Sequence, residues 1–216
     1  EVEYIVDNSD AKAFFVDAEF APMIDSVKNS LSKIPAENYI AVGPSCDGYH
    51  EYEAFITDSA DHEPDAEVDS RDTWILIYTS GTTGHPKGAC LSHRNILLNV
   101  AMTTLMHQRS DRDTVVTALP CPHVYGNVIM SCAIQNGSTL VLHPAFEEAT
   151  ILQSIQDHKA TRFEGVPTMY MFLLNHPQLV DYDLSSLCCC TVGGQTMPKP
   201  KMEEVEARFG CPLIEV

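Results

Sequence analysis

The chain has 216 residues, 44% of them hydrophobic, so it can bury a substantial core as one large domain or two small ones. Its 13 Lys and Arg residues face 30 Asp and Glu residues, and the net charge of −17 argues against binding nucleic acid or anionic membranes through overall charge. No apolar run is long enough to cross a membrane, and 8 cysteines without a C-x-x-C pair favour a reducing compartment, which we expect to be the cytoplasm.

Helices and strands alternate in the first part of the chain. An acidic stretch with few apolar residues, 51–72, predicts a solvated, mobile linker. The apolar run that follows it, 74–78, predicts a buried strand. Before the linker we expect a short helix at 1–9, a strand at 11–17, a helix at 20–33 ended by Pro35, and a strand at 39–43.

The segment after the apolar strand, Thr79 to Ala89, holds no bulky apolar side chain. Glycines let backbone N–H groups turn inward around an anion, hydroxyls add donors, and a lysine supplies a mobile positive charge. The segment therefore predicts a phosphate-binding loop. A flexible surface loop is the alternative, but the strand, hydroxyls, glycines, proline and lysine occur together here. The polar and glycine residues concerned are Thr79, Ser80, Gly81, Thr82, Thr83, Gly84, Lys87 and Gly88.

The rest of the chain predicts a succession of parallel strands and covering helices. Ser92 offers an N-cap for a helix that begins near Asn95, reaches Arg109 and buries one wide face. The fold class is α/β, with a largely parallel sheet flanked by helices. Further strands are expected at 113–119, 138–143, 162–166, 187–192 and 213–216, and helices at 127–135, 147–158, 167–175 and 198–210. The triplet Cys188 to Cys190 is interpreted as buried free thiols in a strand.

Two turns after strands add candidate ligand contacts. In LPCPHVYGN, residues 119–127, two prolines stiffen the turn, Gly126 leads into a helix, and His123 and Tyr125 stand between them. A lone histidine is more often structural, but this one follows the carboxyl end of a strand, where α/β sheets bind ligands. In TVGGQTMP, residues 191–198, two glycines would let a flat ring lie on the backbone, although an ordinary strand-to-helix turn has the same pattern.

The loop YTSGTTGHPKG, Tyr78 to Gly88, resembles the phosphate-loop signature of the acyl-adenylate-forming superfamily, which includes acyl-CoA synthetases, nonribosomal adenylation domains and firefly luciferase. The common G-x-x-x-x-G-K-[ST] loop does not fit, because Pro86 stands at its second glycine and Gly88 follows Lys87. The resemblance covers essentially the whole chain and is greatest to fatty-acid–CoA ligases. It also implies an α/β N-terminal adenylation domain.

The resemblance implies a role for each candidate residue. His123 would contact the acyl carboxylate or its adenylate and, with Lys87, act in catalysis. Tyr125 and Gly126 would border the acyl tunnel. The loop residues Thr79, Ser80, Gly81, Thr82, Thr83, Gly84 and Lys87 would bind the ATP phosphates with Mg2+, and Gly193, Gly194, Gln195 and Thr196 would form the adenine turn, where Gln-Thr replaces the family's usual Ala-Pro. No residue of the chain is assigned as a metal ligand.

The implied reaction is ATP-dependent activation of a carboxylic acid, followed by thioester formation with CoA. No aspartate occurs from Pro120 to Asn127, which favours a plain acid over an amino acid. A fatty acid is the first expectation and an aryl acid the second, with luciferase-type oxidation third. A non-catalytic nucleotide-binding fragment stays open.

The resemblance also implies that residues 1–216 form part of the N-terminal adenylation domain, in segments 1–50, 51–72 and 73–216. The acidic magnesium ligand, the hinge and the C-terminal domain would then lie further on, so we expect this chain alone to be inactive. Its partners would be the acid, ATP and CoA, without nucleic acid.

Overall fold

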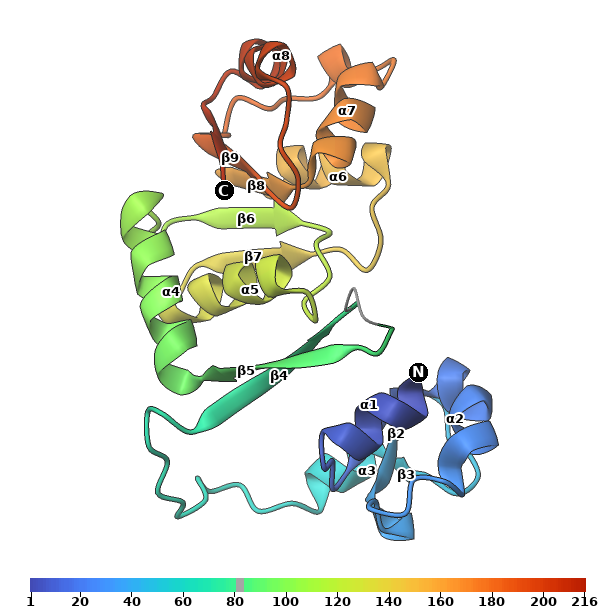
Figure 1. The fold of residues 1–216 in the computed structure, drawn as a ribbon. Helices are drawn as coiled ribbons and strands as arrows, with labels where there is room; N and C mark the ends of the chain where they lie inside the picture. Colours follow the sequence, from blue (N-terminus) through green and yellow to red (C-terminus); the bar gives the residue numbers. More distant parts are fainter. Residues whose placement is uncertain (81–83) are drawn as a thin grey trace. The chain divides into compact units, whose positions relative to one another are not determined.

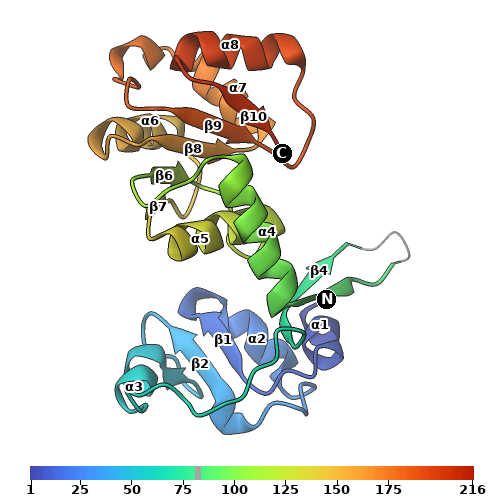
Figure 2. The same cartoon turned by 90° about the vertical axis from the view of Figure 1, so that its left-hand side faces the viewer.

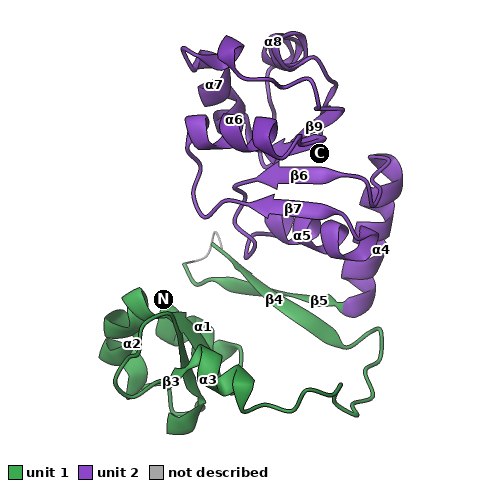
Figure 3. Cartoon of the chain, turned by 180° about the vertical axis from the view of Figure 1, so that it is seen from behind, with its two compact units in different colours: residues 1–92 green, residues 93–216 purple. Residues whose placement is uncertain are grey.

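The computed structural model describes residues 1–80 and 84–216 (Figure 1). The chain divides into two compact units, Glu1–Ser92 and His93–Val216 (Figure 3). Three predicted phosphate-loop residues, Gly81, Thr82 and Thr83, lie outside the described residues. Among the described residues, no helix has the length and apolar character needed to span a membrane.

The first unit opens with a parallel sheet in the order β1–β2–β3, whose first two strands were predicted and whose third was not. Val6, Ile24 and Tyr39 join its helices to the sheet in one buried cluster. The predicted helix over 20–33 is shorter, because the Ser30 hydroxyl donates to the Val27 carbonyl oxygen, 2.7 Å away, and competes with helix continuation. The elements are α1 (Val2–Asn8), β1 (Phe14–Asp17), a 3-10 helix (Ala18–Phe20), α2 (Ala21–Lys28), a second 3-10 helix (Ala36–Asn38), β2 (Tyr39–Val42) and β3 (His50–Glu51).

The acidic segment is not wholly a linker. A helix, α3 (Tyr52–Thr57), forms at its start, and the Phe55 ring meets the Phe15 ring edge-on at 6.1 Å between centroids. This ring contact joins α3 to β1, although both side chains stay exposed, Phe15 at 53% and Phe55 at 44%. Residues 58–72 contain no helix or strand and are exposed, as the composition predicted.

A two-stranded antiparallel ribbon ends the first unit. The predicted strand forms as β4 (Thr73–Thr79), but its predicted burial is wrong, since Trp74 is 43% and Leu76 36% exposed. Among the residues that the structure describes, β4 pairs only with β5 (Lys87–Ser92) and no further strand extends the ribbon, which leaves these side chains exposed. Strand β5 was not predicted, because its small and polar residues show no clear alternation.

The second unit is a five-stranded parallel sheet in the order β10–β9–β8–β6–β7, which confirms the predicted α/β class (Figure 2). The predicted helix over 167–175 is confirmed, and helix α5 begins three residues earlier than expected. The strands are β6 (Thr114–Thr117), β7 (Thr139–Leu142), β8 (Arg162–Gly165), β9 (Cys189–Val192) and β10 (Leu213–Glu215). The helices are α4 (His93–Met106), α5 (Val124–Asn136), α6 (Glu148–Asp157), α7 (Pro167–Asn175) and α8 (Lys199–Phe209), with a 3-10 helix at Leu179–Asp181.

The two faces of this sheet differ in chemistry. Val116, Phe163 and Cys190 lie on one face in the main apolar cluster, with residues of α6, α7 and α8. Side chains alternate along a strand, so Glu164 and Thr191 point to the opposite face, where α5 packs. Both side chains are buried. The face toward α5 therefore carries buried polar groups.

Helix α4 does not bury the wide face that its sequence predicted. Of its residues, Ile96 and Val100 are buried, and it packs against α5, where the Asn136 amide donates to the Thr104 hydroxyl over 3.1 Å. Several large apolar side chains of α4 are instead exposed: Leu97, Leu98, Met102, Leu105 and Met106. The helix begins at His93, two residues before the predicted start.

The cysteine triplet is only partly buried. Cys188 is exposed, Cys189 is half-buried, and Cys190 alone of the three is buried. Cys189 and Cys190 belong to β9, so alternation sends only one of them into the main cluster. The thiol of Cys190 lies 3.6 Å from that of Cys211, and both are free.

Candidate functional site

Three strand ends converge at one edge of the second unit. Strand β6 lies between β7 and β8. The next strand in the chain, β7, is added on one side of β6, and the strand after that, β8, is added on the opposite side, so the strand order reverses at β6. Parallel sheets bind ligands at the carboxyl ends of strands beside such a reversal. A cavity of about 300 Å3 lies there, lined by His123 after β6, Val166 after β8, and Gly194 and Gln195 after β9. The structure thus brings together the predicted carboxylate turn and adenine turn.

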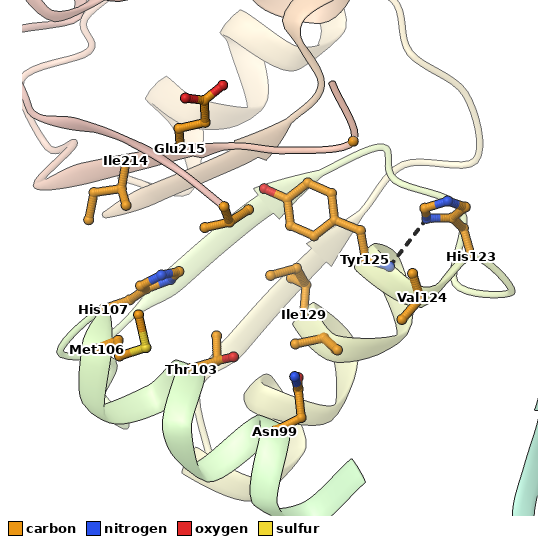
Figure 4. A pocket seen from close by; sticks show the side chains of 13 residues that line it. Asn99, Thr103, Met106, His107, His123, Val124, Tyr125, Ile129, Ile214 and Glu215 are labelled. Atoms are coloured by element: carbon orange, nitrogen blue, oxygen red, sulfur yellow. Dashed lines mark hydrogen bonds between the residues drawn. The ribbon is translucent and has the colours of Figure 1, made fainter. Parts of the chain in front are cut away.

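His123 is the N-cap of α5. Its Nδ1 atom accepts a hydrogen bond from the Tyr125 backbone N–H, 3.2 Å away (Figure 4). Because Nδ1 accepts, the ring proton of the neutral imidazole sits on Nε2. The side chain is exposed. His123 can therefore donate from Nε2 to an oxygen of a ligand while its other nitrogen holds the turn in place.

Gly126 lies within the first turn of α5 rather than before the helix. A Cβ atom at this position would stand 2.3 Å from the Pro120 carbonyl oxygen, which belongs to the backbone. The same oxygen accepts from the His123 N–H over 3.0 Å. The turn closes tightly over this glycine, so its lack of a side chain helps to fix His123.

Tyr125 lies against the glycine turn. A Cβ atom at Gly193 would come 3.0 Å from the Tyr125 ring and 2.7 Å from Val216, so these two side chains already occupy the space next to Gly193. Gly194, with φ of +84°, and Gln195 are exposed and offer the open side of the turn. Adenine stacking on this turn stays a prediction. The fourth residue assigned to it, Thr196, is exposed and lines neither cavity of this site.

A second cavity of about 430 Å3 lies between α4, α5 and β10 (Figure 4). Its lining is mainly apolar, with Met106, Val128 and Ile129 among its residues. Asn99 and Thr103, four residues apart, share one face of α4, and His107 follows directly after that helix; these three side chains form a polar stripe in the lining. Both cavities share three residues, which are His123, Tyr125 and Gly194. The two cavities therefore meet at the predicted carboxylate turn.

The phosphate-loop residues that the structure describes belong to the first unit. Thr79 ends β4 and pairs in register with Lys87, which begins β5. Gly84 has a φ of +98°, a conformation that side chains rarely adopt. Ser80 and Gly84 line a cavity of about 400 Å3, in which the rings of Tyr4 and His85 stack at 4.9 Å between centroids.

Comparison with known proteins decides the family. The sequence profile of the family described as "AMP-binding enzyme" matches residues 1–216. The chain belongs to this AMP-binding enzyme family. An indoleacetate–CoA ligase of Aromatoleum aromaticum is 33% identical over 204 residues, or 94% of this chain and 39% of that protein. A long-chain-fatty-acid–CoA ligase of Bacillus subtilis is 39% identical over 147 residues, or 67% of this chain and 26% of that protein.

Solved structures carry the same fold. The N-terminal domain of FACL13 from Mycobacterium tuberculosis matches with a TM-score of 0.88 and 23% identity, over 99% of this chain and 52% of that one. A luciferase-like enzyme from the mealworm Zophobas morio matches with a TM-score of 0.86 and 26% identity, over 99% and 50%. The predicted resemblance to adenylate-forming enzymes and the predicted α/β fold are both confirmed. The chain spans less than half the length of the curated relatives compared above.

The second unit also has a buried polar network that was not predicted from the sequence. Arg109 and Glu164 form an ion pair at 2.6 Å, with side chains 3% and 0% exposed. Burial raises the pKa of Glu164, while the charge of Arg109 acts in the opposite direction. Burial, and then the charge of Arg109, lowers the pKa of His107. The available signal was the presence of two charged residues, Arg162 and Glu164, in the short predicted strand with the sequence RFEG.

Proposed function

We propose that the protein activates a carboxylic acid with ATP and transfers the acyl group to CoA. The observation that carries this proposal is the pair of cavities meeting at His123 and Tyr125, one mainly apolar and the other bordered by the glycine turn. Several of the relatives that the chain matches bear the names of CoA ligases for fatty and aromatic acids. The acyl group would occupy the larger cavity, with its carboxylate at His123.

The reaction has two steps. A carboxylate oxygen attacks the α-phosphorus of ATP, a new P–O bond forms, and the bond to the departing pyrophosphate breaks. The CoA thiolate then attacks the acyl carbonyl carbon, and AMP leaves with the shared oxygen. His123 donates a hydrogen bond from Nε2 to the carboxylate and keeps its proton, so it orients the nucleophile and stabilises charge without an acid–base cycle.

The nucleotide would be held by both glycine-containing segments. The loop residues Thr79, Ser80, Gly81, Thr82, Thr83, Gly84 and Lys87 would bind the phosphates, and Gly193, Gly194, Gln195 and Thr196 would border the adenine. The described residues contain no group of three or more His, Cys, Asp or Glu side chains able to hold a metal. We infer that Mg2+ reaches the site on the ATP phosphates, with hydroxyls such as that of Ser80 nearby. Bound there, it would neutralise phosphate charge.

A fatty acid is the proposed substrate, because apolar side chains dominate the larger cavity. An aryl acid is the second candidate. The polar side chains of Asn99, Thr103 and His107 in its lining favour it, since a hydroxylated aryl acid can form hydrogen bonds with them and His107 is buried. The free thiols of the described residues suit a reducing compartment such as the cytoplasm.

Pyrophosphate exchange tests the proposal. The whole protein should exchange labelled pyrophosphate into ATP only when an acid is present, and should form a thioester when CoA is added. A panel of saturated fatty acids and hydroxylated aryl acids separates the two substrate classes. His123→Ala should reduce exchange, whereas His143→Ala, at another strand end outside both cavities, should retain it. Nucleotide binding without acid-dependent exchange would favour the non-catalytic alternative and overturn the proposal.

A further inference from the structure

Glu164 is a fully buried carboxylate beside the site. It lies in β8, on the sheet face toward α5, and is 0% exposed. Arg109 donates to its Oε1 over 2.6 Å, and the Tyr125 hydroxyl donates to its Oε2 over 3.2 Å. One oxygen is thus used by the ion pair and the other by a residue that lines both cavities.

The Tyr125 hydroxyl is held from two sides. It lies 2.9 Å from the Thr191 hydroxyl as well as 3.2 Å from Glu164. A carboxylate only accepts, so the tyrosine proton points to Glu164 and the Thr191 hydroxyl can donate to the tyrosine oxygen. Burial and the nearby Glu164 charge raise the pKa of Tyr125, which keeps that proton in place at neutral pH. Gly193 closes the space beside the ring.

A buried ion pair adds little net stability over apolar residues of the same volume, because taking both charges out of water offsets their attraction. What this pair adds is a fixed acceptor for one hydroxyl. We propose that Glu164 is a positioning residue that holds the Tyr125 ring as the partition between the two cavities and thereby sets which acyl lengths fit. The acyl part of this inference rests on the proposed function.

A double-mutant cycle tests whether Glu164 acts through Tyr125. The variants are Glu164→Gln, Tyr125→Phe and both together. Tyr125→Phe keeps the ion pair and removes only the hydroxyl, so the test survives if Glu164→Gln fails to fold. Asp113→Asn is the matched control, because it breaks a second buried ion pair of the same unit, Asp113 with Arg162 at 3.0 Å, and Asp113 lines neither cavity.

The first readout needs no ligand. The ring carbon signals of Tyr125, assigned through the Tyr125→Phe variant, should move and broaden in Glu164→Gln but not in Asp113→Asn. The second readout is the ratio of the dissociation constants of octanoyl- and hexadecanoyl-sulfamoyladenosine, which are non-hydrolysable adenylate analogues. Glu164→Gln should change this ratio by about fivefold, the effect of losing one net hydrogen bond.

The inference is decided by comparing the effect of Glu164→Gln in the wild-type protein with its effect in the Tyr125→Phe variant. In the Tyr125→Phe background, Glu164→Gln should change the ratio by less than about twofold, because no hydroxyl remains for the carboxylate to hold. An equal change in both backgrounds would show that Glu164 acts as a general stabiliser, and would overturn the inference. If neither analogue binds the wild-type protein, the proposed function fails instead, and the tyrosine signals alone decide whether Glu164 positions the ring.

Discussion

Replacing Gly126 by alanine sets two effects against each other. In most helical positions this change stabilises a helix by about 1 kcal/mol. Here the new Cβ atom would lie 2.3 Å from the Pro120 carbonyl oxygen and 2.7 Å from its carbonyl carbon. Ordinary contact begins at 3.4 Å, and both partners are backbone atoms that no side-chain rotation can move. The turn itself must therefore shift.

Forced overpacking of this kind costs about 1–3 kcal/mol. After subtraction of the helix preference of about 1 kcal/mol, we expect the second unit to lose up to about 2 kcal/mol of unfolding free energy. His123 should also move, because its N–H donates to the same carbonyl oxygen over 3.0 Å. The local geometry thus predicts the opposite sign to helix propensity.

Hydrogen exchange of the β6 and β8 amides measures the loss, because it reports opening of the second unit rather than of the whole chain. The control is Gln135→Ala, at an exposed position of the same helix, which should change protection by less than about 0.5 kcal/mol. Increased protection in Gly126→Ala would mean that the turn accommodates a methyl group, and would refute the argument from close approach.

The remaining predictions concern charge and the acid site. Lys87→Ala should raise the KM for ATP by at least about tenfold and leave the KM for the acid nearly unchanged, as steady-state kinetics with each substrate varied would show. His123→Ala should reduce pyrophosphate exchange while calorimetric ATP binding stays near wild type. Burial alone would raise the pKa of Asp113, but the Ser110 N–H and Arg162 lower it below its ordinary value of 3.8. The contribution of Asp113 to stability is therefore complete above that value and is lost as pH falls through the folded pKa. In Asp113→Asn the free energy of unfolding should therefore fall less on acidification than in the wild-type protein.

Proline and glycine residues predicted the helix ends of the second unit well. Pro167 begins α7, because proline lacks a backbone N–H and the first turn of a helix needs no N–H donor there. Gly137 ends α5 with a φ of +69°, because glycine adopts the left-handed conformation without strain. The turn containing His123 and the turn containing Gly194 were found from local pattern as well. Parallel strands then bring such turns to one edge, whatever their distance in sequence.

Burial and long-range pairing could not be predicted in this way. The apolar residues of β4 and α4 suggested burial, but what covers an apolar face is decided by other elements. Strand β5 forms because β4 offers it a partner, and its own sequence shows no alternation. The contact of Arg109 with Glu164 joins residues 55 apart along the chain, and nothing near either one marks the pairing.

The most direct test of the two-cavity site is a crystal structure of the protein with dodecanoyl-sulfamoyladenosine. The account predicts the acyl chain in the cavity between α4 and α5, the sulfamoyl group within hydrogen-bonding distance of His123 Nε2, and the adenine beside Gly194. An acyl chain bound away from Tyr125, with His123 making no contact with the sulfamoyl group, would contradict the assignment of this turn as the carboxylate site.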